Sequence, residues 1–144
     1  MSNADVHRAI RDGITRGVAV VGLAGVALIH LIDAPGKFTE TPYMGWMYVG
    51  LIASCLVVAA FLIRHGDRRA WAATLALPAL VLIGFVLSRT TGLPQAHDDV
   101  GNWSEPLGVA SMFVEGSLIA LAGGVLAEQF AFAPRRRFEA VTQS

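Results

Sequence analysis

Four apolar segments divide the chain, and polar or charged stretches separate them. The apolar segments cover residues 14–32, 42–63, 70–88 and 106–130. At about 1.5 Å of rise per residue, each can cross, or nearly cross, a hydrocarbon core of about 30 Å as a helix. None alternates between apolar and polar residues, and helices then remain the practical way to satisfy the backbone in lipid. The pattern predicts an all-α, polytopic membrane protein: a four-transmembrane-helix bundle in a single domain.

The polar stretches predict how these helices are connected. Residues 33–41 and 89–105 are expected to form two loops on one side of the membrane. Residues 64–69 are expected to form a short loop on the other side, and residues 131–144 a tail there. The chain then consists of two hairpins. Because the connections are short, neighbouring helices are expected to be antiparallel and adjacent.

Composition and charge add a class and an orientation. With 54% hydrophobic residues and a mean hydropathy of +0.56, the chain is too apolar for a soluble domain. The net charge is zero, yet nine of the eleven basic residues fall on the side of the termini: Arg8, Arg11, Arg16, Arg64, Arg68, Arg69, Arg135, Arg136 and Arg137. By the positive-inside rule, both termini are predicted to be cytoplasmic and loops 33–41 and 89–105 to face outward, across the cell (plasma) membrane.

Several function classes find no support in the sequence. Cys55 is the single cysteine, which excludes a disulfide framework or a CxxC pair within one chain. No phosphate-binding glycine loop, HExxH motif or nucleophile elbow is present. The basic clusters are short and close to the membrane, so nucleic-acid binding is not expected. The chain is therefore expected to have no catalytic residues, and no cofactor is strongly implied.

Glu115 is the most unusual residue because its carboxylate falls inside an apolar run, Leu107 to Ala127. An ionisable group at membrane depth is costly, and it normally faces a protein interior and has a partner. Helical spacing places it on one stripe with Gly108, Ser111 and Ala122. This small, polar face is expected to point into the bundle. Glu115 is a candidate for ligand, proton or cation binding, with a structural hydrogen bond between helices as the alternative.

Four further residues are candidates for an outward polar cluster. His30 and Asp33 are three residues apart on one helix face, so the carboxylate could hydrogen-bond to the imidazole. Arg89 ends the third helix, and its expected partner is Glu115, Asp33 or Glu105. The alternatives are an Asp that caps a helix, and an Arg that only neutralises charge. We treat His30, Asp33, Arg89, Glu105 and Glu115 as ligand or ion candidates.

A metal site has only weak candidates. His30, His97, Asp98 and Asp99 carry suitable ligand atoms and are predicted on the outward side. They are scattered over loops, and the sequence HDD is more typical of a solvated acidic turn. A haem with two histidine ligands is less expected, because only His30 lies on a predicted membrane helix.

Three motifs carry a resemblance. They are His30, Asp33, Ala34 and Pro35 in HLIDAP, then SRTTGLP at Ser88–Pro94, and then EPLG at Glu105–Gly108 followed by Glu115. These segments, about half the chain, resemble a group of uncharacterised four-span integral membrane proteins of high-GC Gram-positive bacteria. The resemblance implies the same topology and a bacterial membrane, and it implies no activity. Similar sequences often have an acidic residue or His where this chain has Gly36 and Lys37, which argues against a metal site.

Taken together, these features predict a non-catalytic accessory, sensing or scaffold subunit with a polar cluster in its outward half. Small residues on the helices are typical of close helix packing, and they suit a homo-oligomer or a larger membrane complex. The alternative is an oligomeric small transporter or channel that uses Glu115 as its proton or cation site. A third hypothesis is a metal or redox module that serves an exported enzyme.

Overall fold

The computed structural model describes residues 2–142, with side chains described up to Ala131. In this range the chain forms four long helices, α1 (Asn3–Glu40), α2 (Pro42–Arg64), α3 (Arg68–Thr90) and α4 (Pro106–Thr142), and one short 3₁₀ helix, η1 (His97–Asp99). No strand occurs in the described residues. All four long helices are long and apolar enough to cross a membrane. The prediction of an all-α chain with four membrane-spanning helices is confirmed at this level.

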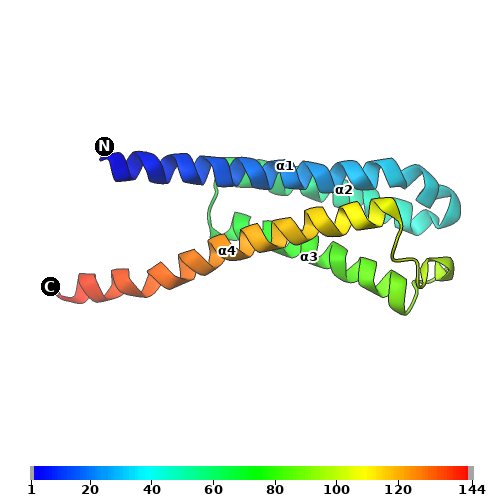
Figure 1. Cartoon of the computed structure of the whole chain (residues 1–144). Helices are drawn as coiled ribbons and strands as arrows, with labels where there is room; N and C mark the ends of the chain where they lie inside the picture. Colours follow the sequence, from blue (N-terminus) through cyan, green and yellow to red (C-terminus); the bar gives the residue numbers. More distant parts are fainter. Residues whose placement is uncertain (1, 143–144) are drawn as a thin grey trace.

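The helices pack side by side as a bundle (Figure 1). Each helix packs against the next one in the chain, and α4 also packs against α1. The two ends of the chain and the α2–α3 turn lie at one end of the bundle, and the other two connections lie at the opposite end. We call this second end the loop end, because it holds the α1–α2 turn and residues 91–105. The predicted adjacency of antiparallel neighbours is confirmed.

The prediction of a loop at residues 33–41 is wrong, because α1 continues through this stretch to Glu40. Pro35 lies inside the helix, where it removes one backbone hydrogen bond. Two contacts hold the helix end beyond Pro35. The Thr41 amide donates to the carbonyl of Lys37 at 2.8 Å, and the ring of Phe38 packs edge-on against Trp46, with 5.5 Å between the ring centroids.

The other predicted boundaries agree more closely with the observed helices. The loop that was expected to begin at residue 89 begins after Thr90, and the loop that was expected at residues 64–69 is limited to residues 65–67. The predicted tail at 131–144 continues as α4 to Thr142 along its backbone, and residues 143–144 lie outside the described residues. The arginines at 135–137 lie in the part of α4 whose side chains are outside the description.

The apolar core occupies the part of the bundle away from the loop end. Its buried side chains come from all four helices: Ala19, Leu23, Val26, Ala27, Cys55, Leu62, Ala70, Trp71, Leu118, Ala122 and Leu126. Two glycines let α1 approach α4 closely. A Cβ atom at Gly22 would lie 2.7 Å from Cδ2 of Leu118, and one at Gly25 would lie 3.4 Å from Val114. Close backbone packing of this kind is a main source of helix association in lipid.

Large apolar side chains also cover the outside of the bundle. Val21, Leu56, Leu80 and Phe113 are each more than 60% exposed. A soluble protein rarely exposes so much apolar surface on every helix, whereas lipid solvates it without cost. The exposed apolar side chains and the hydropathy of the helices therefore both indicate that the bundle is suited to a bilayer.

Candidate functional site

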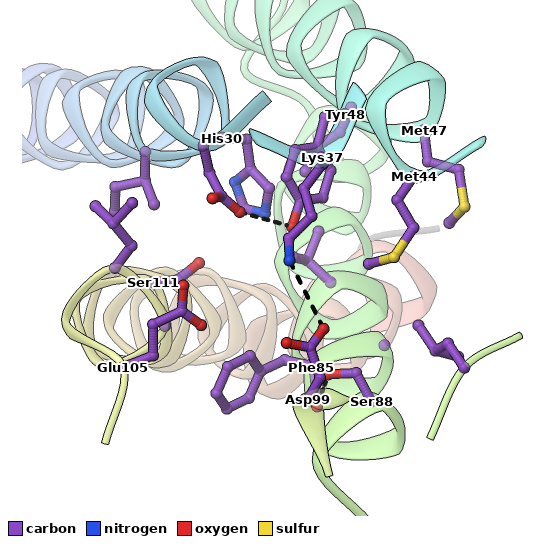
Figure 2. Close-up of a pocket in the computed structure, with 18 of the residues that line it drawn as sticks. His30, Lys37, Met44, Met47, Tyr48, Phe85, Ser88, Asp99, Glu105 and Ser111 are labelled. Carbon is purple, nitrogen blue, oxygen red and sulfur yellow. Dashed lines mark hydrogen bonds and ion pairs between the residues drawn. The ribbon is translucent and has the colours of Figure 1, made fainter. Parts of the chain in front are cut away.

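A cavity of about 320 Å³ lies among the four helices near the loop end (Figure 2). Its volume falls in the range of small-molecule sites. One wall is polar and comes mainly from α1, α4 and the loop before α4: His30, Asp33, Lys37, Asp99, Glu105 and Ser111. The facing wall is mainly apolar and comes from α2 and α3: Met44, Met47, Leu51, Leu77, Leu80, Val81 and Phe85, with Tyr48, Ser88 and Arg89 as its polar members. The cavity therefore has the two-sided chemistry that an amphiphilic molecule needs.

The cavity opens sideways between α2 and α3. These two helices make the fewest contacts of the four neighbouring pairs. Met47 on α2 and Leu80 on α3 both border the cavity, and they are 62% and 66% exposed, so the two helices do not close it between them. In a bilayer this opening faces the lipid, so a hydrophobic ligand can reach the cavity without crossing the loop end.

His30, Tyr48 and Asp33 form a linked group on the cavity wall. The Nδ1 atom of His30 lies 2.9 Å from the carbonyl oxygen of Val26, one turn back on α1. The imidazole packs edge-on against Tyr48, with 4.7 Å between ring centroids, and the Tyr48 hydroxyl donates to Oδ2 of Asp33 at 3.1 Å. The predicted hydrogen bond between His30 and Asp33 is therefore wrong. Each side chain has found a nearer partner, a backbone carbonyl for His30 and a phenol for Asp33.

Four charged residues form a network across the loop end, which we call the charged cap: Lys37, Asp99, Arg89 and Glu105. The Nζ atom of Lys37 lies 3.7 Å from Asp99, and Nη1 of Arg89 lies 2.7 Å from the same carboxylate. Nη2 of Arg89 pairs with Glu105. The cap joins the end of α1, the η1 segment, the end of α3 and the residue before α4, so it closes the cavity at this end of the bundle.

Arg89 is the central member of the charged cap. Its side chain is only 5% exposed, and its guanidinium also lies 5.0 Å from the centroid of the Phe85 ring. Of its three expected partners, Glu105 is confirmed, whereas Glu115 and Asp33 make no ion pair with it in the described residues. Asp99 takes their place. Sequence reasoning could not identify it because the backbone of residues 91–101 decides which loop carboxylate reaches α3.

Glu115 lies deeper, behind the cavity wall. It is fully buried, and its Oε1 accepts a hydrogen bond of 2.6 Å from Ser111. Its Oε2 has no hydrogen-bond partner in the described part of the chain. Gly108, Ser111 and Ala122 are also buried, as the helical spacing predicts. Ser111 lines the cavity while Glu115 does not, so the serine separates the carboxyl group from the cavity.

The weak metal candidates do not come together. No group of three or more His, Cys, Asp or Glu side chains with metal-site geometry occurs among the described residues. His97 and Asp98 are exposed in η1, whereas His30 is buried on α1 and Asp99 belongs to the charged cap. Met44 and Met47 border the cavity without a cluster of such ligands beside them.

Sequence reasoning missed two residues of the site. Tyr48 supports both His30 and Asp33, and Lys37 connects α1 to the charged cap. Lys37 carried a usable signal, because it is one of only two cations expected on the outward side and had to find a carboxylate there. Tyr48 carried none, since a tyrosine near a helix end is as typical of the lipid interface.

Comparison with known proteins adds no further constraint. No protein-family model matches the chain, and no curated protein or solved structure matches it. The cavity and its residues are therefore the features that bear on function.

Proposed function

We propose that this chain is a multi-pass membrane protein that binds a small amphiphilic molecule in the cavity at its loop end, and that it serves as a non-catalytic accessory or sensing subunit. The observation that carries the proposal is the pairing of one polar and one apolar wall in a cavity of about 320 Å³. Ligand sites combine a mainly apolar lining with a few placed polar groups, and this cavity has that composition.

The sideways opening supports an amphiphile over a fully polar solute. A polar solute would have to enter through the charged cap, whose side chains are paired with one another. An amphiphile can enter from the bilayer past Met47 and Leu80, with its tail never leaving an apolar environment. A bound molecule would change the position of α2 relative to α3, because these neighbouring helices pack together least tightly. A partner protein in contact with either helix would detect that change.

We place the loop end outward, with both termini cytoplasmic in a bacterial plasma membrane. Two features support this orientation. The termini and the α2–α3 turn share one end of the bundle (Figure 1), and most of the arginines belong to that end. The outward end then holds the charged cap and the cavity, where an extracytoplasmic or outer-leaflet molecule is accessible.

Binding is tested by native mass spectrometry of the protein purified in nanodiscs, followed by extraction of copurified small molecules. Gly84 lines the cavity on α3, and a Cβ atom there meets only open space, so Gly84→Leu fills the cavity without a clash in the surrounding helices. Gly50→Leu is the matched control, because Gly50 has the same freedom but does not line the cavity. We expect a bound amphiphile on the wild type and on Gly50→Leu, and none on Gly84→Leu. Equal occupancy of the two variants would refute the cavity as the site.

The accessory role is tested separately by affinity purification from native membranes. A subunit of a larger complex would bring down its partner in a fixed ratio, and a homo-oligomeric scaffold would appear as a defined multiple of the chain mass. A solitary monomer under gentle solubilisation contradicts both versions of the role.

A second function, proton or cation transport, is favoured by one observation. Glu115 is fully buried, with one carboxyl oxygen that has no partner in the described residues, and Ser111 connects it to the cavity wall. In proteoliposomes, Glu115→Gln should then abolish a pH-dependent flux, while Glu128→Gln, at a carboxylate that is 62% exposed, should leave it intact. The absence of flux in the wild type would dismiss this function.

A further inference from the structure

The charges around the cavity are out of balance. Three carboxylates line it, from Asp33, Asp99 and Glu105, against the two cations Lys37 and Arg89. Lys37 is shared by Glu40 and Asp99, and Arg89 by Asp99 and Glu105. The carboxylate of Asp33 is left without an ion pair in the described residues, and the Tyr48 hydroxyl is its one hydrogen-bond donor there. Lys37, one helical turn further along α1, is close enough to interact with Asp33 but makes its ion pairs with Glu40 and Asp99.

His30 adds a second acceptor on the same wall. It is only 7% exposed, and its Nδ1 must carry the proton that it shares with Val26, because a carbonyl oxygen can only accept. In the neutral ring Nε2 is then an acceptor, and it has no hydrogen bond with any described residue. Figure 2 shows the ring beside Tyr48 on the cavity side of α1. The two cations that line the cavity, Lys37 and Arg89, are paired with other carboxylates. Asp33 and the Nε2 atom of His30 are thus two acceptors without a cation of their own in the described residues.

We propose that the cavity takes a primary alkylammonium ion, with its ammonium group at Asp33 and His30 and its alkyl chain along the α2 and α3 wall. This inference depends on the proposed function, since it names the class of amphiphile bound there. An ammonium group supplies one positive charge and three N–H donors. The Tyr48 ring beside it adds a cation–π face. The chain lies against Met47, Leu51 and Leu77 and points to the sideways opening.

Other head groups fit the same atoms less well. A carboxylate or phosphate would meet the carboxylate of Asp33, which has no ion pair in the described residues. Both terminal nitrogens of Arg89 are already engaged by carboxylates, and only its buried Nε lacks a hydrogen-bond partner there. A quaternary ammonium ion has charge but no N–H for the Nε2 atom of His30. A divalent metal ion lacks its ligand set, because no cluster of three suitable side chains occurs among the described residues.

The test compares octylamine, octanol and octanoate, which share a tail and differ in head group, on the full chain in phosphatidylcholine nanodiscs. Dissociation constants follow from the ligand-dependent shift of the unfolding temperature. We expect the wild type to bind octylamine about tenfold more tightly than octanol, as one charge-assisted hydrogen bond provides, and to bind octanoate least. Asp33→Asn keeps an acceptor for Tyr48 but removes the charge. It should lower amine binding to the level of octanol and leave octanol binding unchanged.

Two variants separate the site from general effects of charge and lipid. Asp98→Asn removes an exposed carboxylate that does not line the cavity, and it should bind like the wild type. Gly84→Leu should weaken binding of all three probes. If octylamine and octanol bind equally, or if the amine preference survives Asp33→Asn, the alkylammonium inference is overturned and the amphiphile cavity stands. If none of the probes binds and Gly84→Leu changes nothing, both proposals fail.

Discussion

The guanidinium of Arg89 lies 2.7 Å from the carboxylate of Asp99, and this ion pair joins the end of α3 to the segment that leads to α4. The same guanidinium pairs with Glu105, immediately before α4 begins. One buried side chain thus fixes both ends of a fifteen-residue connection, residues 91–105. That connection carries Asp99 and Glu105 to the cavity, so Arg89 positions this part of its lining.

The first prediction concerns the stability that Arg89 provides. Arg89→Ala leaves Glu105 without its cation and Asp99 with Lys37 alone, and loss of one partner from a buried pair costs about 3–5 kcal/mol. The free energy of unfolding, measured in mixed micelles by circular dichroism, should fall by this amount. Arg11→Ala is the control, because the pair of Arg11 with Glu128 is exposed and such pairs contribute about 0–1 kcal/mol. Equal losses in the two variants would contradict the role of the charged cap.

The second prediction concerns Ser111, whose hydroxyl is the donor to Glu115. Ser111→Ala leaves a fully buried carboxyl group without that hydrogen bond, which should cost about 1–3 kcal/mol of unfolding free energy. Ser117→Ala is the matched control, since Ser117 lies on the exposed face of the same helix and donates only to the carbonyl of Phe113. Its cost should stay within about 0.5 kcal/mol. If Ser111→Ala leaves the free energy of unfolding unchanged, Glu115 does not need this donor.

The third prediction concerns the contact of α1 with α4. Alanine at Gly22 would place Cβ 2.7 Å from Cδ2 of Leu118, and Leu118 is itself 2% exposed and has little room to move. Gly22→Ala should therefore destabilise the bundle by about 1–3 kcal/mol, as overpacking does. A second substitution, Leu118→Ala, should recover part of the loss. Gly17→Ala, where the added methyl group meets nothing within 4 Å, should cost nothing, and an equal loss there would argue against close packing at Gly22.

The four helices were predictable because their signal is long and local. About twenty apolar residues in a row can be buried in lipid only as a helix, whatever their neighbours do. The end of α1 was not predictable for the opposite reason. Asp33, Pro35 and Gly36 are typical turn residues, yet α1 continues through them because Lys37 and Phe38 have partners outside α1, Asp99 in η1 and Trp46 in α2. Tertiary contacts there outweigh local preference.

The sequence predicted which residues form the candidate site better than it predicted which of them contact one another. Scarcity of charge at membrane depth singled out His30, Asp33, Arg89 and Glu105, and the structure brings all four around one cavity. Which atoms meet depends on helix rotation and on the path of residues 91–105, and sequence spacing along one helix does not determine either. Glu115 was expected in the same cluster, but the helical turn between it and Ser111 places it behind the wall.

The fourth prediction concerns orientation across the membrane. Cys55 is the one cysteine and is 1% exposed, so Cys55→Ala gives a background free of thiols in which single cysteines can be placed. Asn3, His65 and Asn102 are exposed, the first two at the end with the termini and the third at the loop end. With the arginine-rich end inside, a membrane-impermeant maleimide should label Asn102→Cys in intact cells, while Asn3→Cys and His65→Cys react only after lysis. The reverse pattern would place the cavity on the cytoplasmic side. The alkylammonium would then be a cytoplasmic or inner-leaflet molecule, because the chemistry of the cavity does not depend on which side it faces.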